Sequence, residues 1–543
     1  MTIAVEKTLE EVISLVLEEA DRALKNPYKF KKPIKNVAII GAGPSGLPTA
    51  RRLKEAGFNV RVFERNSVVG GIWAYSEESP LKPKIPSSRD KNDVESEVYD
   101  IPAEGVQKRT VEMTPEIKKL LLSKCPPSPC YRDLQGNNSS RLFALPGLAF
   151  PEGTPLFCSH RVLGKFFQDY AEKFELLPLI EFDTSVDLVK KNDDDTWELY
   201  LSKYDVYPSG LVRISTWRET FDAVVAATGI QQKGFVPDFK DLTAWNKMWP
   251  DKAIHSNQYR RPEDFHDKNV LIVGGSISAC DISRSLEGFA RTVTMSMRGP
   301  FESSSYIFNL VRSAIPKSTS IRPNITSFSN IQGHVDGSVL FEDGTVLDSI
   351  DHVIFCTGYT NNLGFFGTNM EEDYEPTGMN PEPTQTYADV PEAKVIVRGS
   401  YPLNVYQEVF LMSDPTFAFV GYAPYFVTPT HFDTQAQAVA RVWTGNALLP
   451  TVELMSKFTQ EYDLGLDPAG LYEVDRRRKE HFSTWLNHHA KILHKDDGVE
   501  LPEVENYPEY WEKEGPEAML KLVDISENHY KETREAIKKR CCL

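Results

Sequence analysis

The stretch Val37-Ala38-Ile39-Ile40-Gly41-Ala42-Gly43-Pro44-Ser45-Gly46 decides the fold of this chain. Its apolar half predicts a short buried strand, and a helical run over 47–56 follows the glycine turn. Gly41 permits the tight turn, Gly43 lets the backbone approach a pyrophosphate, and Gly46 lets the helix pack on the strand. The next apolar run ends at Glu64, which is placed to accept hydrogen bonds from a ribose. Strand, turn, helix, strand and acid in this order predict a dinucleotide-binding unit.

A second glycine turn, Gly274-Gly275-Ser276-Ile277-Ser278-Ala279, follows the apolar run 270–273. Ser276 replaces the second glycine of the pattern, but serine is small and its hydroxyl can donate to a phosphate. The strand predicted over 292–297 ends at Arg298, with no acid at that place. Because an arginine suits a 2′-phosphate, the pattern favours NADPH over NADH, bound by Gly275, Ser276, Ser278 and Arg298. The alternative for Arg298 is an ordinary exposed arginine at a strand end.

Length and composition limit the class of protein. The 543 residues exceed what one hydrophobic core usually holds, so several domains are expected. The net charge of −16 argues against nucleic acid as a partner. Seven cysteines, an odd number without metal-ligand spacing, indicate a reducing compartment and no metal site. No apolar stretch is long enough to span a membrane. These features predict a soluble, cytoplasmic protein.

The two turns predict an α/β fold of two nested Rossmann-like dinucleotide-binding domains. The FAD-binding domain is expected to be discontinuous, formed by residues 34–234 and 352–470, with an NADPH-binding domain (235–351) inserted between these segments. An N-terminal amphipathic helix and linker (1–33) precede it, and a charged helical C-terminal extension (471–543) follows. Residues 76–130 are polar and rich in proline, which indicates an insertion within the first FAD segment. The amphipathic helix is expected to dock on its own domain.

Four motifs together resemble the flavin-containing monooxygenases, in particular soluble members of fungal or bacterial type. They are Gly70-Gly71-Ile72-Trp73, His255-Ser256-Asn257-Gln258-Tyr259-Arg260, Phe355-Cys356-Thr357-Gly358-Tyr359, and Phe432-Asp433-Thr434-Gln435-Ala436-Gln437-Ala438 followed by Arg441. With the first glycine turn, the resemblance covers roughly residues 35–460. The chain departs from the family at Trp249 and Asp251, where the second motif normally begins with Phe-x-Gly.

The resemblance implies a monooxygenase in which NADPH reduces FAD and the reduced flavin forms a C4a-hydroperoxide that passes one oxygen to a soft nucleophile at nitrogen or sulfur. The implied FAD residues are Gly41, Gly43, Pro44, Ser45, Gly46, Glu64, Gly71, Ile72, Trp73 and Gln435. An asparagine after a Tyr-Arg-x-Leu segment faces the flavin in the family, and Asn137 follows Tyr131-Arg132-Asp133-Leu134 here. Asn137 is therefore the catalytic candidate, although an Asn-Asn-Ser run alone is typical of a turn.

Three alternatives stay open on sequence grounds. Baeyer-Villiger oxygenation of a ketone is disfavoured because those enzymes typically carry tryptophan where Tyr259 stands. A disulfide reductase is suggested by Cys125 and Cys130, but this pair lies far from the Gly-Gly turn. A non-catalytic dinucleotide-binding protein is the third. The expected partners are a small nucleophile and O2, and a homodimer is left open. Reversible acylation of Cys541 and Cys542 is also left open.

Overall fold

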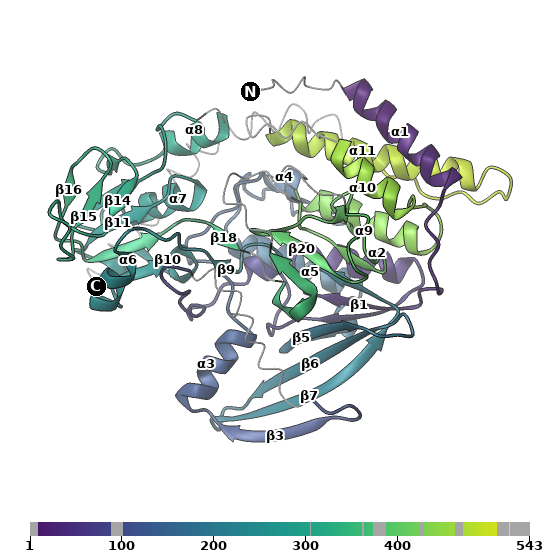
Figure 1. Cartoon of the computed structure of the whole chain (residues 1–543), viewed down its shortest axis with the longest axis horizontal. Helices are drawn as coiled ribbons and strands as arrows, with labels where there is room; N and C mark the ends of the chain where they lie inside the picture. The colour runs from purple at the N-terminus through teal and green to yellow at the C-terminus, as the bar shows by residue number, and fades with distance from the viewer. Residues whose placement is uncertain are drawn as a thin grey trace.

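The structure is a computed structural model that describes residues 9–87, 101–303, 306–360, 363–372, 387–423, 428–461, 471–507, 521 and 531. Two lobes, each built on a parallel sheet, lie side by side, and a separate antiparallel sheet extends from the larger lobe (Figure 1). The prediction of an α/β fold with two Rossmann-like units is confirmed. Cys541 and Cys542 lie outside the described residues.

The larger lobe is centred on a seven-stranded sheet. Its strand order is β22 (Val405–Tyr406), β23 (Phe410–Leu411), β24 (Phe417–Phe419), β8 (Ala223–Ala226), β1 (Asn36–Ile40), β2 (Asn59–Phe63) and β4 (Ile180–Glu181). Pairing is parallel from β24 to β4, with Ile40 opposite both Phe63 and Ala226. The apolar residues of β1 are almost entirely buried on both faces, as expected for a central parallel strand.

Helices cover one face of this sheet. They are α2 (Gly46–Glu55), α5 (His160–Lys173), α9 (Pro429–Trp443), α10 (Val452–Glu461), α11 (Leu471–Leu493) and, outermost, α1 (Leu9–Lys25). The antiparallel strands β5 (Thr184–Lys191), β6 (Trp197–Val206) and β7 (Leu211–Phe221) contribute Trp197, Leu199 and Phe221 to the core on the other face. The first glycine turn is thus fixed by packing on two sides.

The insertion predicted over 76–130 has more structure than its sequence indicated. Strand β3 (Gln107–Glu112) pairs along β7 and adds a fourth strand to the antiparallel sheet. Helix α3 (Pro115–Lys124) then packs Ile117, Leu120 and Leu121 against that sheet. Strand β3 is exposed on nearly every side chain, and for this reason it shows little hydrophobic alternation.

The smaller lobe holds a five-stranded parallel sheet. Its order is β10 (Ala253–His255), β17 (His352–Phe355), β11 (Asn269–Val273), β12 (Thr292–Ser296) and β13 (Ser320–Arg322). Helices α6 (Leu242–Met248), α7 (Ile277–Leu286) and α8 (Tyr306–Ser313) complete it, with a small sheet of β14 (Ile325–Ser327), β15 (Val339–Phe341) and β16 (Val346–Leu347). Because β17 pairs with β10 and β11, this unit extends past the boundary expected at residue 351.

Short elements complete the chain. They are α4 (Ser140–Phe143), the 3-10 turns η1 (Gly71–Trp73), η3 (Leu177–Leu179), η4 (Ser256–Gln258), η5 (Pro262–Phe265) and η6 (Gly364–Asn369), the pair β9 (Lys233–Gly234) and β18 (Tyr359–Thr360), and the small sheet of β19 (Met370–Glu372), β20 (Val395–Arg398) and β21 (Tyr401–Pro402). The β9 and β18 pair lies where the chain passes between the two lobes.

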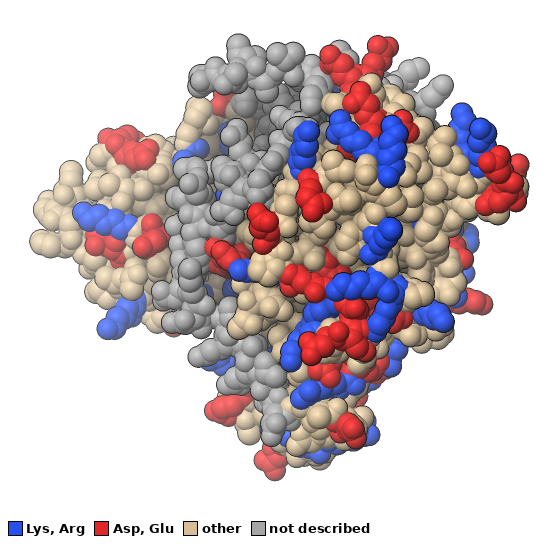
Figure 2. All heavy atoms as spheres, turned by 45° about the vertical axis from the view of Figure 1, so that its right-hand side comes forward, with Lys and Arg blue, Asp and Glu red and all other residues tan. Residues whose placement is uncertain are grey.

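The first and the last long helices pack together. Helix α1 buries Val12, Val16 and Ala20, lies along α11, and so docks on its own chain as its amphipathic pattern predicts (Figure 1). Helix α11 is more than the charged extension expected from sequence, because Trp485 and Leu486 are fully buried in the main core. No helix in the described ranges has the length and apolar character needed to cross a membrane. On the face in Figure 2, acidic and basic side chains are interspersed.

Candidate active site

The first glycine turn lies at the carboxyl end of β1, between β2 and β8. Gly41 donates its amide to Phe63 O at 2.8 Å and has φ +105°, a conformation that L side chains rarely adopt. A Cβ on Gly46 would lie 1.9 Å from Gly41 O, so no side chain fits there. Ser45 is buried and donates to Ala227 O at 3.3 Å. The turn therefore has the shape that lets a pyrophosphate approach the start of α2.

Glu64 lies beside this turn at the end of β2. Its carboxylate accepts hydrogen bonds from Ala42 N at 2.7 Å and Asn66 N at 2.8 Å. Burial raises the pKa of Glu64 above its ordinary value, an effect that these amide donors oppose. Glu64 is thus buried next to the glycine turn, and its role as a ribose acceptor stays a prediction.

The Gly70-Gly71 turn packs directly on the first one. A Cβ on Gly71 would lie 3.0 Å from Gly43 Cα, so the two backbones meet at close range. Trp73 is half-buried with its ring 5.5 Å from that of Phe143, and Ser128 donates its hydroxyl to Ala74 O at 2.7 Å. Ile72 is half-buried in the same 3-10 turn. This flank fixes one wall of the candidate FAD site.

Gln435 supplies the best single test of whether a flavin fits. It is fully buried on α9, and its Oε1 accepts from Gly421 N at 3.0 Å. Its Nε2 is buried and has no hydrogen-bond partner among the described residues. A Cβ on Gly421 would lie 2.8 Å from Ser45 Cβ, so this glutamine is near the first glycine turn. An unsatisfied buried donor there matches a ligand with acceptor atoms, such as a flavin ring.

Asn137 lies in the loop between α3 and α4. It is half-buried, and its neighbour Gly136 donates to Cys158 O at 2.8 Å. A Cβ on Gly136 would lie 2.9 Å from Leu163 Cδ1, so the loop is pressed against α5. The adjacent Asn138 is buried, with an Oδ1 that lacks a hydrogen-bond partner among the described residues. Gly136 anchors the start of the loop on α5, while the catalytic role of Asn137 stays a prediction.

The second turn follows β11 and is also tightly packed. Gly274 has φ +132°, and a Cβ there would lie 2.3 Å from Cys356 O. A Cβ on Gly275 would lie 2.8 Å from Met297 Cβ, which explains the glycine at this position. Ser276 is exposed immediately before α7, and Ser278 is half-buried in its first turn. The serine that breaks the glycine pattern therefore leaves the phosphate-facing surface open.

Arg298 is exposed just after β12. The sequence analysis did not single out Arg312 on α8. This residue joins the loop that follows Arg298 to the second glycine turn. Arg312 donates through Nε to Gly275 O at 2.9 Å and through Nη1 to the carbonyl oxygens of Pro300 and Phe301, at 3.3 and 2.5 Å. These contacts connect segments far apart in sequence, so no local pattern could have revealed them.

The segment from His255 to Arg260 begins at the last residue of β10 and leads towards β11 of the smaller lobe, and Arg260 donates to Glu78 O and Ser128 O, both at 3.2 Å. His255 is buried, its Nε2 lies 2.9 Å from Gly358 O, and its Nδ1 accepts from Asn257 N at 3.1 Å. Burial lowers the pKa of His255 to about 4, so the ring is neutral at pH 7. Tyr259 is buried with its hydroxyl 2.7 Å from Ser285 Oγ. The sequence predicts that both are linker residues rather than catalytic ones, and this stays a prediction.

Cys125 and Cys130 are both free thiols. Burial is the main cause that raises the pKa of each to about 12. A redox-active pair needs an accessible thiolate, which this environment opposes. The disulfide-reductase alternative therefore loses its only specific support.

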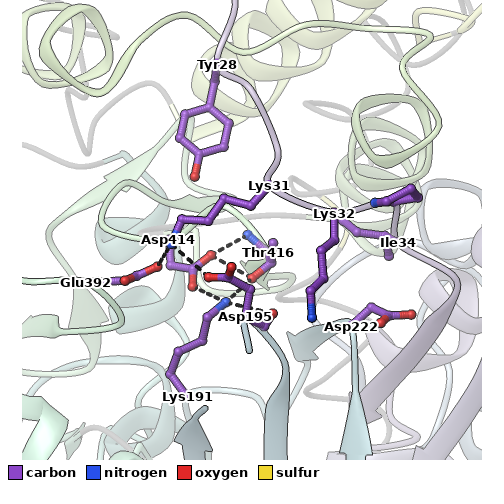
Figure 3. Close-up of a pocket in the computed structure, with 11 residues that line it drawn as sticks. Tyr28, Lys31, Lys32, Ile34, Lys191, Asp195, Asp222, Glu392, Asp414 and Thr416 are labelled. Atoms are coloured by element: carbon purple, nitrogen blue, oxygen red, sulfur yellow. Dashed lines mark hydrogen bonds and ion pairs between the residues drawn. The ribbon is translucent and has the colours of Figure 1, made fainter. Parts of the chain in front are cut away.

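A charged pocket lies elsewhere on the larger lobe (Figure 3). Lys31 contacts Asp195 at 2.8 Å and Glu392 at 2.9 Å, and Lys191 contacts Asp414 at 2.6 Å. The walls of this pocket include Asp222 and Thr416, which lie just before β8 and β24, at the amino ends of those strands. Dinucleotides bind at the carboxyl ends. We therefore interpret the pocket as an ion-pair network that anchors the linker after α1.

Comparison with known proteins identifies the family. A family model described as flavin-binding monooxygenase-like matches residues 127–314 and 308–375, and one for NAD(P)-binding Rossmann-like domains matches residues 39–100. The flavin-containing monooxygenase ustF2 of Aspergillus flavus is 30% identical over 467 residues, which cover 81% of this chain and 87% of that protein. The chain belongs to the flavin-containing monooxygenase family. The flavin-containing monooxygenase iboF of Amanita muscaria is 28% identical and covers 85% of this chain and 89% of that protein.

Solved structures show the same fold. The S-allyl-L-cysteine S-oxygenase from Allium sativum superposes with a TM-score of 0.59 at 24% identity, covering 92% of this chain and 99% of that chain. Membership of the family makes this protein an NADPH-dependent flavoprotein monooxygenase with FAD and NADPH as cofactors. The glycine turns, Glu64 and the unsatisfied Gln435 amide fit the first of these groups, and the turn after β11 fits the second.

Proposed function

We propose that this flavin-containing monooxygenase transfers one oxygen atom of O2 to a nitrogen or sulfur atom of a small nucleophilic substrate. The observation that supports this most is the position of the segment that leads to Asn137, which is hydrogen-bonded to Ala74 of the larger lobe and to Arg260 and Asp281 of the smaller lobe. When bound and reduced by NADPH, the flavin supplies the oxygen-activating chemistry. The protein must then bind and orient the cofactors and the substrate, and exclude water from the site.

Each lobe has a defined role in the proposed site. The first glycine turn and Glu64 would hold the pyrophosphate and ribose of FAD, while Ile72, Trp73 and Gln435 would orient the ring. Gly275, Ser276 and Ser278 would hold the NADPH phosphates, and Arg298 the 2′-phosphate. Asn137 would face the flavin and donate a hydrogen bond there.

The acid-base inventory favours a soft nucleophile over a ketone. Glu64 is buried beside the ribose position, and His255 is a neutral linker residue held by Gly358 and Asn257. Neither is arranged as a general acid or base, and an amine or thioether needs none because it already carries a reactive lone pair.

The free thiols among the described cysteines support a reducing, cytoplasmic location. A homodimer stays a prediction that sedimentation of the purified protein would test.

The substrate class is tested by supplying the FAD-loaded enzyme and NADPH with trimethylamine, a thioether and cyclohexanone in turn. We expect NADPH and O2 consumption to match formation of an N-oxide or a sulfoxide. Lactone as the only product would favour the Baeyer-Villiger alternative. NADPH oxidation that yields only hydrogen peroxide with every amine and thioether would contradict the proposal.

The role of Asn137 is tested with Asn137→Ser, beside Asn138→Ser as the matched control. Removing one oriented amide donor should lower the rate of substrate oxygenation by about 10²-fold and divert reducing equivalents to hydrogen peroxide. FAD content should stay near that of the wild type, because Asn137 lies outside the glycine turn. If Asn138→Ser releases the peroxide and Asn137→Ser does not, the assigned residue is wrong.

A further inference from the structure

The segment 128–136, which precedes Asn137, is bonded to both lobes. On the larger lobe, Ser128 donates its hydroxyl to Ala74 O beside the Gly70-Gly71 turn, and Gly136 donates to Cys158 O. The chain between these two anchors passes across to the smaller lobe. It is therefore the place where a change in one lobe can reach the other.

Tyr131 is the deepest contact of this segment with the smaller lobe. Its side chain is 7% exposed and belongs to the hydrophobic core of that lobe, which includes Ile272 and Ala279. Its ring meets that of Tyr259 edge-on at 5.5 Å. At the end of the ring, the hydroxyl donates to Asp281 on α7. A residue next to the candidate catalytic loop is thus packed into the nucleotide-binding lobe.

Backbone contacts strengthen the same junction. Arg132 donates its amide to Arg260 O at 3.0 Å, and Arg260 Nη2 donates to Ser128 O at 3.2 Å. Arg132 also donates through Nη1 to Glu263 at 2.8 Å. The segment 128–136 is therefore hydrogen-bonded to residues 260 and 263 of the smaller lobe. Tyr131 adds a contact with α7.

Helix α7 carries both the nucleotide turn and the partner of Tyr131. Ser276 immediately precedes the first residue of α7, and Asp281 lies little more than one turn further along the same helix. Asp281 is oriented by Arg284, whose Nη2 donates to its Oδ1 at 2.7 Å. A shift of α7 on nucleotide binding at its amino end would also move Asp281, because both lie in the first turns of one helix.

We propose that the Tyr131–Asp281 hydrogen bond is a positioning contact that couples NADP(H) bound at α7 to the loop carrying Asn137. Tyr131 is packed in the core of the smaller lobe and acts only through the loop. With the bond intact, nucleotide binding orders the loop and favours transfer of oxygen to the substrate. Without it, nucleotide binds but the loop is ordered less often. The proposal rests on the proposed function only in the experiment that measures oxygenated product or hydrogen peroxide.

The test compares Tyr131→Phe with Tyr259→Phe. Both variants lose one buried hydroxyl and keep the ring, but the Tyr259 hydroxyl bonds to Ser285 within the smaller lobe. We expect Tyr131→Phe to bind NADP⁺ within about threefold of the wild-type Kd, and to lose the protection from hydrogen exchange that NADP⁺ gives residues 128–137. Its fraction of NADPH consumed as hydrogen peroxide should rise severalfold. Tyr259→Phe should keep both the protection and the coupling.

A second variant distinguishes the bond from a general loosening. Asp281→Asn should reproduce the loss of protection, and the double variant should be no worse than either single one, as for two partners of one interaction. Full protection in Tyr131→Phe, or equal loss in Tyr259→Phe, would overturn the proposal. Hydrogen exchange is measured without turnover, so loss of protection in an enzyme that oxygenates no amine or thioether would refute the proposed function and leave the coupling standing.

Discussion

We propose that the single side chain of Arg298 sets cofactor choice. It is exposed after β12, and its loop is fixed by Arg312, which also bonds the second glycine turn. An arginine there has no partner in NADH but forms a charge-assisted hydrogen bond with a 2′-phosphate. We therefore expect the preference for NADPH to depend on the Arg298 guanidinium.

The prediction is that Arg298→Ala raises the Kd for NADP⁺ by about 10- to 100-fold, the equivalent of ~1.5–3 kcal/mol for a hydrogen bond to a charged group. The Kd for NAD⁺ should change little. Calorimetric titration of both nucleotides measures this. Arg291→Ala, at the other end of the same strand and paired with exposed Asp267, is the control. An equal loss for both nucleotides in Arg298→Ala would rule out the 2′-phosphate contact.

Sequence and structure agree best where local sterics decide. The glycines at 41, 46 and 274 sit where a Cβ would strike a backbone oxygen, so their positions in the sequence already defined the turns. The Arg312 and Tyr131 contacts were not predictable, because each joins segments far apart in the chain. A local pattern carries no information about such partners.

At the scale of elements, α11 is the least expected feature. Its sequence is rich in charge, yet Arg478 is buried because it donates to Glu408 at 2.8 Å, and buried Lys479 donates to Thr434 on α9. The charges that suggested an exposed tail are thus satisfied by partners on other elements. A periodicity argument treats such charges as surface residues, and this explains why the depth of packing was missed.

Buried histidines should make this packing sensitive to acid. His431 on α9 and His481 and His489 on α11 are all buried. Burial lowers the pKa of His481 to about 3 and of His489 to about 4, from an ordinary 6.5. The unfolded chain takes up protons below pH 6.5 while the folded chain does not. Stability is therefore present above pH 6.5 and falls as the pH drops towards 4.

The expected loss is about 2 kcal/mol per ring at pH 5, measured as the free energy of unfolding in denaturant against pH. His481→Phe, which is surrounded by Phe458 and Phe482, should move the acid-unfolding midpoint to lower pH. His334→Gln, at an exposed site, should leave it unchanged. The same midpoint in His481→Phe and wild type would show that this ring does not control acid stability.

In the whole molecule, the chain topology gives each lobe one nucleotide-binding turn. Each parallel sheet has one glycine turn at a carboxyl strand end, and the chain enters the smaller lobe and returns, so the two turns belong to one connected unit. The nested order was predictable from the two turns. The boundary at β17 was not, because a strand of the smaller sheet directly precedes the return.

The central claim is that the two lobes together pass oxygen from O2 to a nucleophilic nitrogen or sulfur. The most direct measurement is a single reaction of the FAD-loaded enzyme with NADPH and a thioether or trimethylamine under ¹⁸O2, followed by mass spectrometry of the product. We predict one ¹⁸O atom in each sulfoxide or N-oxide and one product for each NADPH consumed. Product without label, or label found only in hydrogen peroxide with every such substrate, would contradict this claim.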